Sequence, residues 1–198
     1  MARRPPWSRS YRTTPRLRSA GSSDEHRSLA RSPREAAVDR YALRFEVEEF
    51  LFAEADLLDR WELTAWLELF APECEYSIPA TDLPHGDPKR HTFLVHDDRF
   101  LLTQRVQQLL TRTAHAEWPH SRTRRLIANV SASEADNVIE VRANFAVYRM
   151  RYDLVDTYIG QYRHLLARDE AGNFVFRRRR AVLDLESLRP HGKVSIIL

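Results

Sequence analysis

Residues 137–152 read NVIEVRANFAVYRMRY and alternate between apolar and polar side chains along most of their length. The apolar set is Ile139, Val141, Ala143, Phe145 and Val147, and the polar set is Glu140, Arg142, Asn144 and Tyr148. Successive side chains of a β-strand point to opposite faces, so this period of two places each set on its own face. The stretch therefore predicts a long strand with one apolar face.

Three more extended runs flank this strand. They are Arg122–Glu134, Val155–Arg168 and Phe174–Glu186. The segments 135–137 and 169–173 are typical of hairpin turns, because the Asn, Asp and Gly in them adopt turn dihedrals at low cost. The four runs predict an antiparallel sheet. Each run is much longer than the common length of about five or six residues, so we expect a strongly curved sheet whose concave face must be filled.

Three predicted helices lie upstream and can fill that face. Residues 33–59 carry an apolar stripe at steps of three and four, formed by Leu43, Val47, Phe50, Leu51, Ala55 and Leu58. A short helix over 61–70 is expected to end before Pro72, because proline cannot continue the helical hydrogen bonds. Asp97 or Asp98 is a suitable N-cap for a third helix that reaches about residue 113.

Short extended pieces are predicted at Glu75–Ile78, which Pro79 confines to an edge or a terminus, and at His91–His96, after a loop over Ala80–Arg90. The apolar end of the segment Lys193–Leu198 is expected to dock on the rest of the domain. Helices grouped before a sheet predict the α+β class. Three helices packed in a curved antiparallel sheet make a cone.

The composition predicts one domain with an extension. Residues 1–34 hold nine Arg against Asp24 and Glu25, a net charge of +7, so residues 35–198 carry −4 of the total of +3. The extension has few aliphatic residues and is expected to be disordered. A folded part without net positive charge argues against nucleic-acid binding. No apolar run approaches the roughly 18 residues that span a bilayer, so we expect a soluble, cytoplasmic chain with no membrane partner.

Redox and metal chemistry find little support in the residue types. Cys74 is the single cysteine. A Rieske cluster needs two Cys and two His, and one cysteine cannot supply it. Acid–base catalysis remains open, because an isomerase or dehydratase could use several side chains in a cone: Tyr41, Tyr148, Tyr158, Tyr162 and His164. The alternative is that these residues only pack within the sheet.

Two groups of arginines are candidate subunit contacts. Arg122, Arg124 and Arg125 precede the apolar pair Leu126-Ile127, and a run of four arginines covers 177–180. The alternation of a strand splits this run into two pairs on opposite faces. We expect ion pairs to Asp153, Asp156 or Glu140 on neighbouring strands, or to a partner subunit. The candidate interface residues are Arg122, Arg124, Arg125, Arg178 and Arg180.

Several stretches resemble one protein family. They are EVEEFLFAEADLLD at 46–59, WLELF at 66–70, YSIP at 76–79, PHSRTRRLIANV at 119–130 and the ending VSIIL. Together they resemble the small (β) subunits of bacterial aromatic-ring-hydroxylating dioxygenases, the Rieske non-haem iron enzymes, over residues 38–198. The arginine-rich extension and the wide loop Ala80–Arg90 depart from that family.

The resemblance implies a nuclear transport factor 2-like cone and a structural, non-catalytic role, with no catalytic, cofactor-binding or metal residues in this chain. It implies a large (α) subunit that holds a Rieske 2Fe–2S cluster and a mononuclear Fe(II), an α3β3 assembly, and self-association of the small chain as a trimer. The complete enzyme would add O2 to an aromatic ring as a cis-dihydrodiol, with electrons from NAD(P)H. The loop sequences lean slightly to an aromatic acid such as p-cumate. The alternatives are a stand-alone cone-fold isomerase or dehydratase, and a ligand-binding module.

Overall fold

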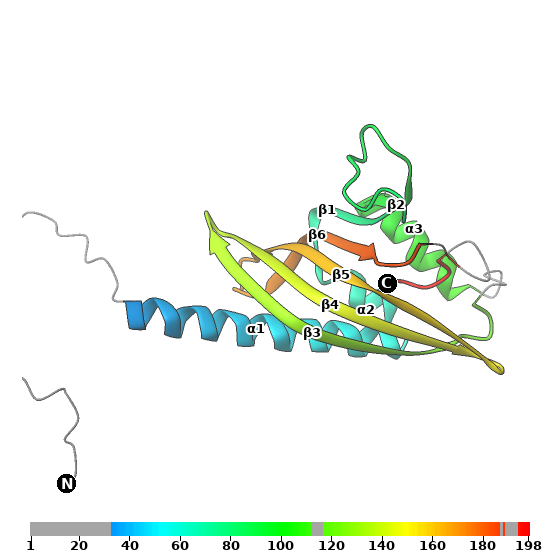
Figure 1. Cartoon of the computed structure of the whole chain (residues 1–198), viewed down its shortest axis with the longest axis horizontal. Coiled ribbons are helices and arrows are strands. Elements are labelled where there is room, and N and C mark those ends of the chain that lie inside the picture. The colour runs from blue at the N-terminus through cyan, green and yellow to red at the C-terminus, as the bar shows by residue number, and fades with distance from the viewer. Residues whose placement is uncertain (1–32, 112–116, 187, 189–193) are drawn as a thin grey trace, which may run out of the picture. The chain divides into compact units, whose positions relative to one another are not determined.

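Four long strands form the centre of the domain in a computed structural model that describes residues 33–111, 117–186, 188 and 194–198 (Figure 1). They are β3 (Arg122–Ala135), β4 (Val138–Arg151), β5 (Leu154–Arg168) and β6 (Phe174–Leu183). Each pairs antiparallel with the next, and they twist together as a curved sheet. The alternation in β4 is confirmed: its predicted apolar face, from Ile139 to Val147, is buried.

Two further strands extend the sheet to six, in the order β2-β1-β6-β5-β4-β3. Strand β1 (Phe70–Pro79) runs parallel to β6 and antiparallel to β2 (Phe93–Asp98). The predicted strand at Glu75–Ile78 was too short, because β1 already begins at Phe70. Its pairing with β6 is interrupted between Phe70 and Glu75, and this irregular stretch accommodates Pro72, which has no N–H to donate.

The helices pack against this sheet as predicted, but the second and third helices are shorter than expected. Helix α1 covers Pro33–Asp59 and contacts β3. Helix α2 spans only Leu63–Leu67, so the predicted helix over 61–70 was too long. Helix α3 (Arg99–Leu110) is capped by Asp98, whose carboxylate accepts the Leu101 N–H at 2.9 Å. Residues 1–32, which make up nearly all of the expected extension, lie outside the described part of the chain. Within the described part, no helix is long and apolar enough to cross a membrane.

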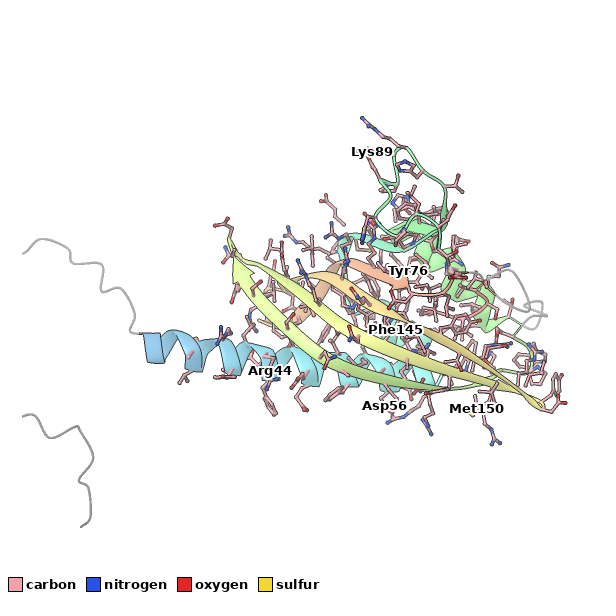
Figure 2. All side chains as sticks on the ribbon, in the orientation of Figure 1. Arg44, Asp56, Tyr76, Lys89, Phe145 and Met150 are labelled. Atoms are coloured by element: carbon pink, nitrogen blue, oxygen red, sulfur yellow. The ribbon has the colours of Figure 1, made fainter. Side chains whose placement is uncertain are left out.

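The last residues of the chain belong to the core. Ile196, Ile197 and Leu198 are buried, and the predicted docking of this segment is confirmed. The backbone N–H of Leu198 donates to the Tyr76 hydroxyl at 3.1 Å, which ties the segment to β1. The loop before β2 projects from the domain instead, with Lys89 near its tip (Figure 2).

Tight turns and one close approach set the path of the long strands. Asp136 and Asn137 both have positive φ between β3 and β4, which matches the predicted turn. Gly160 lies in the middle of β5, where a Cβ would stand 2.0 Å from the carbonyl oxygen of Val182. Glycine is therefore required at this point for β5 and β6 to approach each other.

Candidate functional site

The three arginines at the start of β3 divide between the inside and the outside of the domain. Arg125 is buried, and its guanidinium donates to the Asp59 carboxylate at the end of α1 and to the carbonyl oxygen of Ile197. Arg124 points outward with a 73% exposed side chain, 3.8 Å from Asp59. Arg122 is exposed opposite Met150. Arg125 thus braces one subunit internally, while its two neighbours remain available on the surface.

Arg178 and Arg180 lie on the outer face of the sheet, half-buried. Arg180 donates to the carbonyl oxygens of Pro84 and Gly86 at 3.3 and 3.1 Å, and so holds the loop before β2. Burial lowers the pKa of Arg180, Glu75 partly offsets this, and the positive charges of Arg178 and Arg163 lower the pKa further. The five candidate residues therefore do not form one cluster, because β4 and β5 separate β3 from β6.

Arg179, between those two residues, is fully buried inside the domain. Its guanidinium donates to the Glu54 carboxylate of α1 and to the Leu198 carbonyl oxygen, and it lies 5.0 Å from the centre of the Tyr162 ring. Trp66 donates its indole N–H to the same Glu54 carboxylate at 2.9 Å. Burial by itself lowers the pKa of Arg179, but Glu54 together with Tyr162 and Tyr76 outweighs burial and raises the pKa above its usual value.

The predicted division of the arginine run into two equal pairs was therefore wrong. Arg177 is exposed while Arg179 is buried. The register between β5 and β6 shifts at this point, so that Arg177 is an extra residue and both Phe176 and Arg179 face inward. Arg179 could have been recognised as an inward-facing residue, because it lies two and four residues before Ala181 and Leu183. Both of these residues are apolar and buried, and alternate residues of a strand share a face.

The ion pairs predicted between this run and Asp153, Asp156 or Glu140 are absent among the described residues, whereas pairs with a partner subunit remain a prediction. Asp156 lies opposite Arg149 across β4 and β5 and accepts from its guanidinium at 2.7 Å. Arg149 also donates to the buried Glu117 at 2.8 Å, and Ser121 donates to the same carboxylate at 2.6 Å. A further bond, from the Ser195 hydroxyl to Glu117, connects this cluster to the C-terminal segment. The cross-strand register therefore assigns the carboxylate to a different arginine.

The five candidates for acid–base chemistry do not converge on one point. Tyr41 and Tyr148 are exposed on the outside of the domain, whereas Tyr158, Tyr162 and His164 are buried. The Phe145 ring stacks on Tyr162 at 4.3 Å, and the Tyr162 and His164 rings lie 5.0 Å apart. These contacts fill the space that a substrate would need beside Tyr162 and His164.

The interior nevertheless holds polar atoms without hydrogen-bond partners among the described residues. Among them are the Tyr162 hydroxyl and both ring nitrogens of His164. Burial, together with the positive charges of Arg179 and Arg178, lowers the pKa of His164 well below its usual value. Burial raises the pKa of the Tyr162 hydroxyl, a change that Arg179 partly opposes. Both side chains are therefore neutral at physiological pH.

No metal centre is apparent in the part of the chain that the structure describes, where no three His, Cys, Asp or Glu side chains gather in a way that could hold an ion. Cys74 is a half-buried free thiol on β1. Burial raises its pKa, with Arg99 acting in the opposite direction, so the thiol is protonated rather than a reactive thiolate.

Sequence comparisons with known proteins point to one family. The sequence model described as the ring hydroxylating beta subunit matches residues 53–189. The small oxygenase component of the p-cumate 2,3-dioxygenase system of Pseudomonas putida is 44% identical over 160 residues, which cover 80% of this chain and 88% of that protein.

Solved structures share the fold. A chain of naphthalene 1,2-dioxygenase superposes with a TM-score of 0.71 at 23% identity, over 86% of this chain and 96% of that chain. The β subunit of benzoate 1,2-dioxygenase from Burkholderia mallei superposes with a TM-score of 0.61 at 28% identity, over 75% of this chain and 95% of that chain. The predicted α+β cone of the nuclear transport factor 2-like type is confirmed.

Proposed function

Because this chain belongs to the family of ring-hydroxylating β subunits, we propose that it is the non-catalytic structural subunit of an aromatic-ring-hydroxylating dioxygenase. Its partner is a large (α) subunit that carries the Rieske 2Fe–2S cluster and the mononuclear Fe(II). Three copies of each chain form the enzyme, and this chain holds the large subunits in position. The enzyme works in the cytoplasm.

The packing of the interior carries this proposal. The Glu54–Arg179 ion pair and the C-terminal residues Ile196–Leu198 occupy the concave side of the sheet. The residues that an isomerase would use, Tyr162 and His164, are pressed between aromatic rings. A pocket that binds and releases a substrate requires open space beside its reactive groups. Packing contacts fill that space here, so the interior has a structural role.

We propose an aromatic carboxylic acid as the substrate of the complete enzyme. The 44% identical relative belongs to a p-cumate dioxygenase system, and the similar structure from Burkholderia mallei belongs to a benzoate dioxygenase. The enzyme adds both atoms of O2 to the ring and produces a cis-dihydrodiol, with electrons from NAD(P)H that arrive through a reductase. The substrate pocket lies in the large subunit.

The surface arginines are the proposed contacts with other subunits. Arg122 and Arg124 on β3 and Arg178 and Arg180 on β6 offer planar guanidinium groups that pair well with carboxylates. Arg125 has a supporting role, because its bonds to Asp59 and Ile197 fix the strand that carries the first pair.

The test compares the lone chain with its complex. The full chain is purified alone and together with a large oxygenase component of the p-cumate type. Metal analysis and oxygen uptake with p-cumate and benzoate are then measured on both samples. We expect an equimolar, iron-containing complex that consumes oxygen, and a lone chain that does neither. Stoichiometric iron in the lone chain, or isomerase or dehydratase turnover by it, would contradict the proposal.

A further inference from the structure

Helix α1 carries a second apolar stripe on the side away from the core. Val38, Tyr41, Phe45 and Phe52 are between 48% and 62% exposed. At 3.6 residues per turn these four positions fall within about 60° of the helix circumference, far from the buried face formed by Val47 and Leu51. Large apolar side chains gathered on a free surface mark interaction sites, and aromatic residues are enriched there.

This stripe has an acidic border. Helix α1 contains eight Asp and Glu against three Arg, although Glu54 and Asp59 belong to buried ion pairs inside the domain. Glu46, Glu48 and Glu49 stand next to Phe45 on the helix and are exposed or half-buried. Side chains project from α1 into open space, among them the labelled Arg44 and Asp56 (Figure 2). Arg168 pairs with Glu46 and Arg44 pairs with Glu48, so the outer side of α1 is an aromatic strip with an acidic border that is partly compensated.

The outer face of the sheet has the opposite charge around its own apolar centre. Leu126, Ala146 and Ile159 lie side by side on β3, β4 and β5, and Leu126 and Ile159 are 58% and 48% exposed. Tyr148, partly exposed, adjoins this row, with Arg124 opposite it on β3. We call this surface, together with the arginines described next, the outer patch.

A second row of the outer patch consists of arginines. Arg142, Arg163 and Arg180 lie directly opposite one another on β4, β5 and β6. Like charges in such positions repel, and no carboxylate among the described residues forms an ion pair with any of the three. The Nε atoms of Arg163 and Arg180 are buried without a hydrogen-bond partner. The row is thus a group of cations without a direct ion pair, and only Arg180 is partly compensated, by Glu75.

We propose that the α1 stripe of one copy packs on the outer patch of a second copy, in a head-to-tail contact. This inference rests on the proposed function, which includes self-association of the chain as a trimer. Apolar centre then meets apolar centre, and the glutamates of α1 meet the arginine row. The alternative contacts of like surfaces would place α1 acids against acids, or unpaired arginines against arginines, which is unfavourable.

The two surfaces match in size. From Val38 to Phe52 the helix rises about 21 Å at 1.5 Å per residue. The outer patch extends about 13 Å along β4 from Ala146 to Arg142, and about 14 Å across three strand spacings from β3 to β6, so its diagonal is close to 20 Å. Each copy carries one surface of each kind. After one contact between unlike surfaces, each of the two copies still has one free surface that can bind a further copy. The copies form a closed ring when the rotation that relates neighbouring copies adds up to a full turn.

The experiment uses two double variants of the full chain. The helix variant is Phe45→Ser with Phe52→Ser, and the sheet variant is Arg142→Glu with Arg163→Glu. Control variants change exposed residues elsewhere: Phe100→Ser on α3, which is 68% exposed, and Arg90→Glu in the loop before β2. Native mass spectrometry gives the number of 23.2 kDa copies, and circular dichroism confirms that each variant is folded.

We expect trimers of the wild type and of both controls, and monomers of the helix variant and of the sheet variant. The mixture of the two variants is decisive. The sheet variant retains α1 and the helix variant retains the outer patch, so equimolar mixing should restore one contact and produce heterodimers only. Such complementation requires two unlike surfaces and cannot arise from loss of folding.

Several results would overturn the inference. They are a monomeric wild type, a trimeric helix variant, a trimeric sheet variant, and two monomeric variants that fail to pair when mixed. Failure of the proposed function is observed separately, as a wild-type chain that does not co-purify with the large oxygenase component. A wild type that binds the large component while the variants still form trimers refutes the head-to-tail contact alone.

Discussion

The buried ion pair between Glu54 and Arg179 should behave as one energetic unit. Both side chains are almost completely inaccessible to solvent, and the Arg179 guanidinium also holds the Leu198 carbonyl oxygen. Arg179→Met removes the cation and leaves the Glu54 carboxylate buried, with only the Trp66 N–H as a neighbouring donor. Glu54→Gln removes the anion, keeps an acceptor for Trp66, and leaves a buried guanidinium charge.

The magnitudes follow from these contacts. Loss of one partner of a buried ion pair costs about 3–5 kcal/mol of unfolding free energy, because the remaining charge is not compensated. Arg179→Met should be the more destabilising change by roughly another 1 kcal/mol, since the bond to Leu198 is lost as well. The double variant has no charge left at this site, so it should lose about 2–3 kcal/mol less unfolding free energy than the two single losses added together.

Equilibrium urea unfolding, followed by tryptophan fluorescence, measures all four proteins at one protein concentration, because self-association shifts the apparent stability. The wild type, the two single variants and the double variant form a thermodynamic cycle. A coupling energy below about 0.5 kcal/mol would refute the reasoning, because the effects of two independent residues already add up to within that amount. Single effects below about 1 kcal/mol would show that solvent reaches the pair.

Three other perturbations test the core. The lowered pKa of His164 means that the unfolded chain binds a proton near pH 6.5 that the folded chain does not, so stability should fall as the pH drops from about 6.5 towards 5, by at most about 1.4 kcal/mol per pH unit from this residue. His164→Phe should remove that part of the pH dependence in urea titrations, and an unchanged slope would contradict the lowered pKa. Gly160→Ala should destabilise by about 3 kcal/mol or more in thermal unfolding, because the new methyl group collides with the Val182 carbonyl oxygen; a loss below 1 kcal/mol would mean that the two strands separate easily. Trp66→Ala should cost about 3–5 kcal/mol in urea unfolding, since the ring is fully buried, and a smaller loss than about 1 kcal/mol would show a core that collapses around the gap.

Local periodicity was sufficient for much of the fold. The alternation from Ile139 to Val147 predicted the strand and its buried face, and the apolar stripe from Leu43 to Leu58 predicted α1 with its observed bounds. These patterns are legible in sequence because each element must expose one face and bury the other, whatever it packs against. The order of the elements, and the resemblance carried by residues 119–130, then gave the cone and the family.

Tertiary structure decided which charges are structural. Glu54 and Arg179 are 125 residues apart, and Asp59 and Arg125 are 66 apart, so no local pattern pairs them. The exposure of Arg177, two residues before the buried Arg179, follows from a register shift that depends on how β6 pairs with β5 rather than on the residues of β6 alone. Strand alternation fixes which side chains share a face, but the curvature, the bulges and the docked C-terminal residues decide which of those faces lies in the core.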